Sequence, residues 1–67
     1  MPRNRRSQAH DEKRDEIIAA ATTMFVDGGY DATPMTRIAS AARVATNTIY
    51  WYFKDKDELL VAVLDRV

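Results

Sequence analysis

The segment TPMTRIASAARVATNTIYWYFKDK, residues 33–56, decides the fold of this 67-residue chain. It opens with Thr33, a preferred N-cap residue, and Pro34, which suits the first helical position because its missing N–H would be unpaired there. We therefore predict a short helix that opens at Thr33 and stops near Ala42. The residues 43–45, Arg-Val-Ala, break this helix, and helical spacing resumes after them.

A second short helix is expected over residues 46–53. Ala39 is small enough for two helices to cross closely, Val44 is an apolar residue for the turn, and Ile49 provides an anchor toward the first helix. Two short helices joined by a three-residue turn form a helix-turn-helix unit, whose second helix enters the major groove of DNA. Many ordinary helical hairpins would share this pattern, so the flanking residues matter.

The residues before this segment predict a longer helix, from about Asp11 to Asp27. Its apolar face has the spacing i, i+1, i+4, i+7 and i+8. That face comprises Ile17, Ile18, Ala21, Met24 and Phe25. The pair Gly28-Gly29 should end the helix, because glycine accepts the left-handed conformation common at a helix C-terminus. Tyr30 is then expected to fold back onto the helix.

A fourth helix is expected after residue 55. Asp55-Lys56-Asp57-Glu58 has the spacing of a capping box, in which Asp55 is the N-cap and Glu58 reaches back to it. The six apolar residues 59–64 cover every side of a helix and call for burial all round. A domain of this size cannot supply that burial. We therefore expect the natural protein to continue and cover this helix; the alternative is a short C-terminal helix that dimerises.

These patterns place the chain in the all-α class, as a three-helix, homeodomain-like helix-turn-helix domain plus the start of a fourth helix. The domain is expected over residues 11–67, after a basic N-terminal arm of residues 1–10. Although the net charge is zero, residues 1–14 carry +3 and residues 15–67 carry −3. Concentrated basic charge is the footprint of a polyanion partner. Its arginines, Arg3, Arg5 and Arg6, are candidates for a minor groove; the alternative is a solvated, frayed terminus.

Several classes of protein do not fit this sequence. It has no cysteine and one histidine, His10, and it shows no nucleophile–base pair, glycine-rich phosphate loop or metal-ligand spacing. It also has no secretory signal and no apolar run of the roughly 20 residues that a membrane span needs. We therefore expect a protein that is not an enzyme, needs no cofactor or metal, does not enter a membrane and works in the reducing cytoplasm.

A run of four aromatic residues, Tyr50-Trp51-Tyr52-Phe53, is the strongest single signal. Successive helical residues turn by about 100°, so these four side chains point to different sides. If Ile49 and Phe53 face inward, Tyr50 or Trp51 must be largely exposed, and exposed aromatic residues usually have a partner. Two alternatives remain: all four pack in the core of a missing domain, or the cluster is the hot spot of a helical protein-interaction module.

The chain resembles the N-terminal DNA-binding domain of the TetR family of bacterial transcriptional regulators, over residues from about 14 to 60. The resemblance rests on seven short stretches of the sequence. These are Ile18-Ala19-Ala20-Ala21 with Met24-Phe25, Gly29-Tyr30-Asp31-Ala32-Thr33, Ile38-Ala39, Val44, Thr48-Ile49-Tyr50-Trp51-Tyr52-Phe53 and Lys56-Asp57-Glu58-Leu59-Leu60. It implies a homodimeric repressor of transcription that binds double-stranded operator DNA. It also implies a small-molecule effector bound in a C-terminal ligand-binding and dimerisation domain, which is absent here.

The resemblance also implies roles for individual residues. The base-contacting residues are expected at the start of the second short helix and one turn on: Thr46, Asn47, Thr48 and Tyr50. Asparagine can pair with adenine, and threonine offers a hydroxyl and a methyl group to thymine. The phosphate-contacting residues are expected to be Thr36, Arg37, Arg43, Trp51, Tyr52 and Lys56.

Two positions depart from the family pattern. Arg43 stands in the turn where the family usually has glycine, and a left-handed conformation there would cost a non-glycine residue roughly 1 kcal/mol. Ala45 stands where the family commonly has a Ser or Thr N-cap. The start of the second short helix is therefore either poorly capped at Ala45 or shifted to Thr46.

Overall fold

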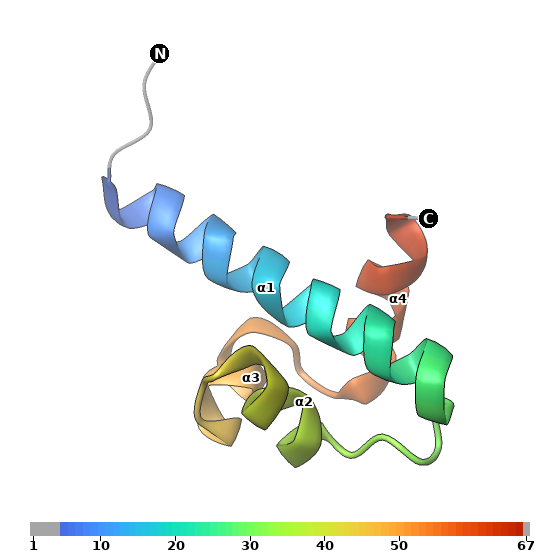
Figure 1. The fold of residues 1–67 in the computed structure, drawn as a ribbon. Helices are drawn as coiled ribbons and strands as arrows, with labels where there is room; N and C mark the ends of the chain where they lie inside the picture. The colour runs from blue at the N-terminus through green and yellow to red at the C-terminus, as the bar shows by residue number, and fades with distance from the viewer. Residues whose placement is uncertain (1–4, 67) are drawn as a thin grey trace.

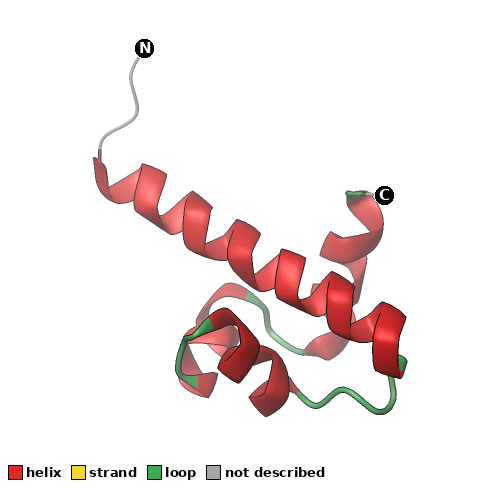
Figure 2. Ribbon diagram, viewed as in Figure 1, coloured by secondary structure: helices red, strands yellow, loops and turns green. Residues whose placement is uncertain are grey.

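The computed structural model describes the backbone of residues 5–66 and the side chains of residues 12–66. Within these residues the chain forms four helices and no strand (Figures 1 and 2). The helices are α1 Arg5–Gly28, α2 Met35–Ala42, α3 Thr46–Tyr52 and α4 Lys56–Asp65. The all-α class and the order of a long helix, two short helices and a fourth helix are therefore confirmed.

The first helix begins earlier than predicted. It starts at Arg5 instead of about Asp11, so residues 5–10, which we expected in the basic arm, continue the helix. No glycine or proline interrupts the sequence between Arg5 and Asp27, and most of the added residues are good helix formers. Arg3, the first arginine of the predicted arm, lies outside the described residues.

Helix α1 lies at the centre of the packing. It packs against both α2 and α4, and α2 packs in turn against α3 (Figure 1). The connection between α2 and α3 is the predicted three-residue turn, which follows Ala42 and ends before Thr46. The short helices α2 and α3 thus lie side by side as a helix-turn-helix unit, held in place by the longer α1.

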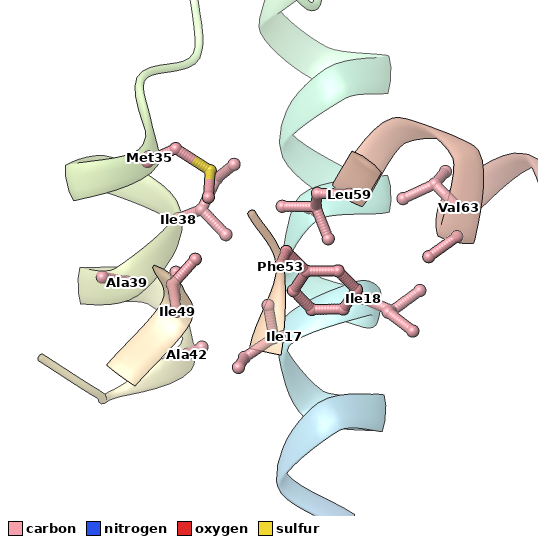
Figure 3. Packing of buried hydrophobic residues seen from close by; sticks show 12 residues of the cluster. Ile17, Ile18, Met35, Ile38, Ala39, Ala42, Ile49, Phe53, Leu59 and Val63 are labelled. Carbon is pink, nitrogen blue, oxygen red and sulfur yellow. The ribbon is translucent and has the colours of Figure 1, made fainter. Parts of the chain in front are cut away.

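The core draws on all four helices. Phe53, which follows α3 directly, is only 1% exposed and lies between Ile17 and Ile18 of α1 and Leu59 of α4 (Figure 3). Burying one such side chain contributes about 1.5–3 kcal/mol. The predicted apolar face of α1 is confirmed, and α2 buries an apolar face of its own. Their buried members are Ile17, Ile18, Ala21, Ile38, Ala39 and Ala42, with Met24, Phe25 and the turn residue Val44 partly buried against them.

The two ends of the α1–α2 loop use different devices. Gly29 has a φ of 89°, a left-handed conformation, so the glycine pair ends α1 as predicted. The prediction for Thr33 was wrong: the N-cap of α2 is Pro34, and it makes no side-chain capping bond. Thr33 is buried, and its hydroxyl donates to the carbonyl oxygen of Gly29 at 2.8 Å. The threonine hydroxyl thus satisfies the end of α1 and not the start of α2.

The last helix has the predicted N-cap and an incompletely covered surface. The Asp55 carboxylate accepts a hydrogen bond from the backbone N–H of Glu58 at 2.9 Å. Leu59, Ala62 and Val63 are buried, but Val61 and Leu64 are 58% and 60% exposed. The six-residue apolar run is therefore only partly covered within the described residues.

Candidate nucleic-acid interface

Two buried anchors fix the orientation of α3. Ile49 is 0% exposed and Phe53 is 1% exposed, and they lie four residues apart on one side of the helix. The Phe53 backbone N–H donates to the Ile49 carbonyl oxygen at 2.9 Å, so the helical turn between the anchors is closed. With these anchors inward, the opposite face of α3 points away from the core, as the sequence predicted.

The outward face of α3 carries the predicted base-contacting residues. Asn47 is exposed, Tyr50 is 50% exposed, and Thr46 and Thr48 are half-buried at the margin of the helix. None of these four side chains is sealed in the interior, and their stretch is helical. The structure thus brings an amide, two hydroxyls and a phenol together on one short helix. These are the groups that hydrogen-bond to base edges.

The turn between α2 and α3 has a left-handed residue at its first position. Arg43 has φ 61° and ψ 43°. Its backbone N–H donates to the Ser40 carbonyl oxygen at 3.1 Å, and the Val44 N–H donates to the Ala39 carbonyl oxygen at 3.0 Å. This pair of bonds is a Schellman motif, which normally places glycine where Arg43 stands. Arg43 is exposed, so its guanidinium lies at the surface beside the start of α3.

The start of α3 is weakly capped. The N-cap is Ala45 and Thr46 is the first helical residue, which settles the alternative that the sequence left open. Ala45 has φ −70° and ψ 152°, the extended conformation of an N-cap, but it has no side-chain oxygen to accept a bond. The start of α3 therefore lacks a side-chain cap, as the sequence predicted for a helix with alanine at this position.

The first turn of α2 presents part of the predicted phosphate-contacting set. Thr36 and Arg37 are both exposed, on the helix that packs directly against α3. Met35 is only 6% exposed and belongs to the hydrophobic core. A polar and a basic side chain are thus the ones that α2 directs outward here.

Trp51 and Tyr52 differ in their burial although they are neighbours. Trp51 is 71% exposed, whereas Tyr52 is half-buried and packs against the core. The two rings meet edge to face, with their centroids 5.2 Å apart. The guanidinium of Arg14 on α1 lies 5.2 Å from the centre of the Phe53 ring, which adds a cation beside the end of α3. The sequence predicted that Tyr50 or Trp51 is largely exposed, and Trp51 is the more exposed of the two.

Lys56 has contacts that the sequence did not predict. Its ammonium donates to the carbonyl oxygens of Tyr30 at 2.8 Å and Thr33 at 3.2 Å. The same nitrogen lies 4.4 Å from the centre of the Tyr30 ring, a cation–π contact. An ammonium has three N–H donors, so two are engaged by the α1–α2 loop. Because Lys56 is the first residue of α4, these contacts hold the start of α4 against that loop.

Tyr30 links the loop to both flanking helices. Its ring lies 5.2 Å from that of Phe25 on α1, which confirms that Tyr30 folds back onto this helix. Its hydroxyl donates to the carboxylate of Asp57 on α4. That hydrogen bond, followed by partial burial and the negative charge of Asp57, raises the pKa of Tyr30 from 10.0 to about 12. Tyr30 lies 26 residues from Lys56 and 27 from Asp57, and no sequence pattern relates residues at such separations.

Within residues 5–66 no helix is long and apolar enough to cross a membrane. Among the described side chains, those of residues 12–66, no three histidine, cysteine, aspartate or glutamate residues gather as a metal site would require.

The helix-turn-helix architecture agrees with a family comparison. Residues 17–63 match the family described as bacterial regulatory proteins, tetR family. The chain belongs to the TetR family, whose members are DNA-binding transcriptional regulators.

The chain is similar in sequence to several curated transcriptional regulators. The chain is 46% identical over 57 residues to the HTH-type transcriptional regulator HbdR of Aromatoleum sp., which covers 85% of the chain and 25% of HbdR. It is 45% identical over 56 residues to the transcriptional activator FasR of Mycolicibacterium smegmatis, covering 84% of the chain and 26% of FasR. It is 42% identical over 60 residues to the transcriptional repressor KstR of the same organism, covering 90% of the chain and 29% of KstR. The chain spans about a quarter of the length of these relatives, which are transcriptional regulators and not enzymes.

Proposed function

We propose that this chain is the operator-binding part of a TetR-type repressor, and that α3 lies in the major groove of double-stranded DNA. The observation that carries the proposal is the outward face of α3, where Asn47 and Tyr50 are exposed while Ile49 and Phe53 anchor the opposite face. A helix held by two core residues keeps its exposed side chains in a fixed geometry, which reading base edges requires.

The residue roles follow from position and chemistry. Base contacts are assigned to Thr46, Asn47, Thr48 and Tyr50, on α3. Phosphate contacts are assigned to residues around its edges on α2, the turn, the end of α3 and the start of α4. These are Thr36, Arg37, Arg43, Trp51, Tyr52 and Lys56, of which Lys56 would use the ammonium proton that the loop carbonyls leave over. Phosphate contacts fix the register of the protein, and base contacts provide the sequence preference.

The finer features of the proposal concern the whole regulator. We assign it a homodimer, a cytoplasmic location and a small-molecule effector that binds in a C-terminal domain and releases the DNA. Relatives named as repressors, such as KstR of Mycolicibacterium smegmatis, support repression over activation, and FasR, named as an activator, is the opposing case. The exposed Val61 and Leu64 of α4 are consistent with a further domain packing there.

Two binding measurements test the proposal. Selection of bound sequences from random duplexes should return a defined motif, and titration with an unrelated duplex at low salt should show binding that weakens steeply as salt rises. A chain that ignores both kinds of duplex is not a DNA reader. That result would favour the helical protein-interaction module, with the aromatic residues 50–53 as its contact surface.

A further inference from the structure

The contacts around Tyr30 form one connected cluster, which we call the Tyr30 cluster. Its members are Tyr30, the carbonyl group of Thr33, Lys56 and Asp57. The Tyr30 carbonyl oxygen accepts from the Lys56 ammonium at 2.8 Å and from the Thr33 backbone N–H at 3.2 Å. The Tyr30 ring lies under the same ammonium, 4.4 Å away. One loop residue therefore contacts Lys56 through both its backbone and its ring.

The cluster joins the two places where helices bearing proposed phosphate contacts begin. Lys56 and Asp57 are the first two residues of α4. Thr33 immediately precedes Pro34, the N-cap of α2, and Thr36 and Arg37 stand in the next turn. The cluster thus fixes the start of α4 against the start of α2, although no direct α2–α4 packing is among the main helix contacts of the described residues.

We propose that Tyr30 is a positioning residue for DNA binding, which acts by holding the Lys56 ammonium and the start of α2 in place. The inference rests on the proposed function, because it concerns residues assigned to DNA phosphates. Lysine has a long flexible stem, and an unheld ammonium must be ordered each time it meets a phosphate. Three contacts that fix the ammonium beforehand remove part of that cost, and they leave one N–H for the DNA.

A double-mutant cycle tests this coupling. The four proteins are the parent chain, Tyr30→Leu, Lys56→Met and the double variant, each titrated with a short duplex of mixed sequence at several salt concentrations. Trp51 is the single tryptophan of the chain and lies on α3, so its fluorescence can report binding. Circular dichroism establishes that each variant is folded at the temperature of the titration.

The double-mutant cycle should show coupling between Tyr30 and Lys56. Lys56→Met should reduce the salt slope by about 0.9, the value for one lost phosphate contact. Tyr30→Leu should weaken binding about five- to ten-fold, a typical effect for coupled neighbours, and move the salt slope toward that of Lys56→Met. In the Lys56→Met background, Tyr30→Leu should change affinity by less than about two-fold, because the coupled partner is already gone. A loss that is the same in both backgrounds, or an unchanged salt slope, would overturn the proposal.

A matched pair of charge deletions provides the control. Asp57→Ala and Asp31→Ala each remove one negative charge near Tyr30, but only Asp57 accepts the Tyr30 hydroxyl. Asp31→Ala should leave binding unchanged or strengthen it, whereas Asp57→Ala should weaken it. Equal effects of the two variants contradict the positioning role. This pair decides the matter if Tyr30→Leu fails to fold.

Failure of the inference can be told from failure of the proposed function. If the parent chain binds no duplex at low salt, the function itself is wrong. If the parent chain binds and the Tyr30 and Lys56 substitutions act independently, only the positioning role is wrong.

Discussion

Arg43 is the one non-glycine residue with a positive φ among the described residues. The Schellman motif at the end of α2 needs this conformation, and a side chain there costs roughly 1 kcal/mol because its Cβ crowds the backbone. A strained residue persists where the surroundings hold it. Arg43 is exposed at the edge of α3 and belongs to the proposed phosphate-contacting set. A phosphate contact made by its guanidinium would explain why an arginine stands at this strained position.

Replacing Arg43 with glycine should therefore separate stability from binding. Arg43→Gly should raise the free energy of unfolding by about 0.5–1 kcal/mol, because glycine accepts the left-handed conformation. It should also weaken DNA binding and lower the salt slope by about 0.9. Urea denaturation and salt-dependent titration measure the two effects. Arg43→Ala is the matched control: it should show the same loss of binding without the gain in stability.

Asn47 is expected to determine which base sequence is preferred and to contribute little to the overall affinity for DNA. Its side chain is exposed on the outward face of α3, so Asn47→Ala should change the free energy of unfolding by less than about 0.5 kcal/mol. Loss of a bidentate amide–base contact should relax the preference at one base position, at a cost of about 1–3 kcal/mol for the preferred sequence. Selection from random duplexes with the parent and the variant would reveal this. An identical selected motif would remove Asn47 from the base-contacting set.

Helices α2, α3 and α4 differ in how their N-termini are capped. At α4 the Asp55 carboxylate accepts from the Glu58 N–H at 2.9 Å. At α2 and α3 the N-caps are Pro34 and Ala45, and neither makes a side-chain bond. Short helices gain little from propensity, because nucleation is costly, so α3 relies on its two core anchors. The helix proposed to read DNA is therefore held chiefly by tertiary packing.

An added cap should stabilise α3. Ala45 already has the extended conformation of an N-cap, so Ala45→Ser needs no backbone change and should raise the free energy of unfolding by about 0.5–2 kcal/mol. Asp55→Ala, which removes the existing cap of α4, should lower it by a similar amount. Urea denaturation followed by circular dichroism measures both. No gain for Ala45→Ser, together with a loss for Asp55→Ala, would show that the start of α3 is already satisfied in another way.

For the molecule as a whole, α1 and the segments that return to it provide the stability. The Phe53 ring joins α1 and α4 in the core, while Arg66 near the C-terminus pairs with Asp15 on α1. The Tyr30 cluster closes the other end of α4 against the α1–α2 loop. Exposed ion pairs contribute little, so the core matters more than the Arg66–Asp15 pair.

The Tyr30–Asp57 bond predicts a particular response to alkali. The pKa of Tyr30 is about 12 in the folded chain against 10.0 when unperturbed, raised chiefly because the neutral hydroxyl donates to Asp57. A folded pKa above the unfolded value means that this contribution to stability is fully present below pH 10 and is lost as the pH rises through 12. Urea denaturation at pH 9 to pH 12 should therefore show a steeper fall for the parent chain than for Tyr30→Phe. Parallel curves would contradict the raised pKa.

Periodicity and end signals alone predicted the four helices, apart from the early start of α1, and the three-residue turn, and the spacing of Ile49 and Phe53 allowed both to face inward. These features depend on residues close in the chain, where helical geometry fixes which side chains share a face. The sequence also located the exposed aromatic on α3, because four consecutive aromatic residues cannot all face one core.

Only the tertiary structure decided the partners of residues distant in the chain. Thr33 reads as an N-cap locally, yet its hydroxyl bonds to the end of α1. Lys56 reads as a free cation in the sequence, but its ammonium is held by the Tyr30 and Thr33 carbonyl groups. Local patterns specify backbone conformation and helix faces. Which face meets which partner depends on how α1 packs the loop and α4 together, and that packing juxtaposes residues that no short-range spacing relates.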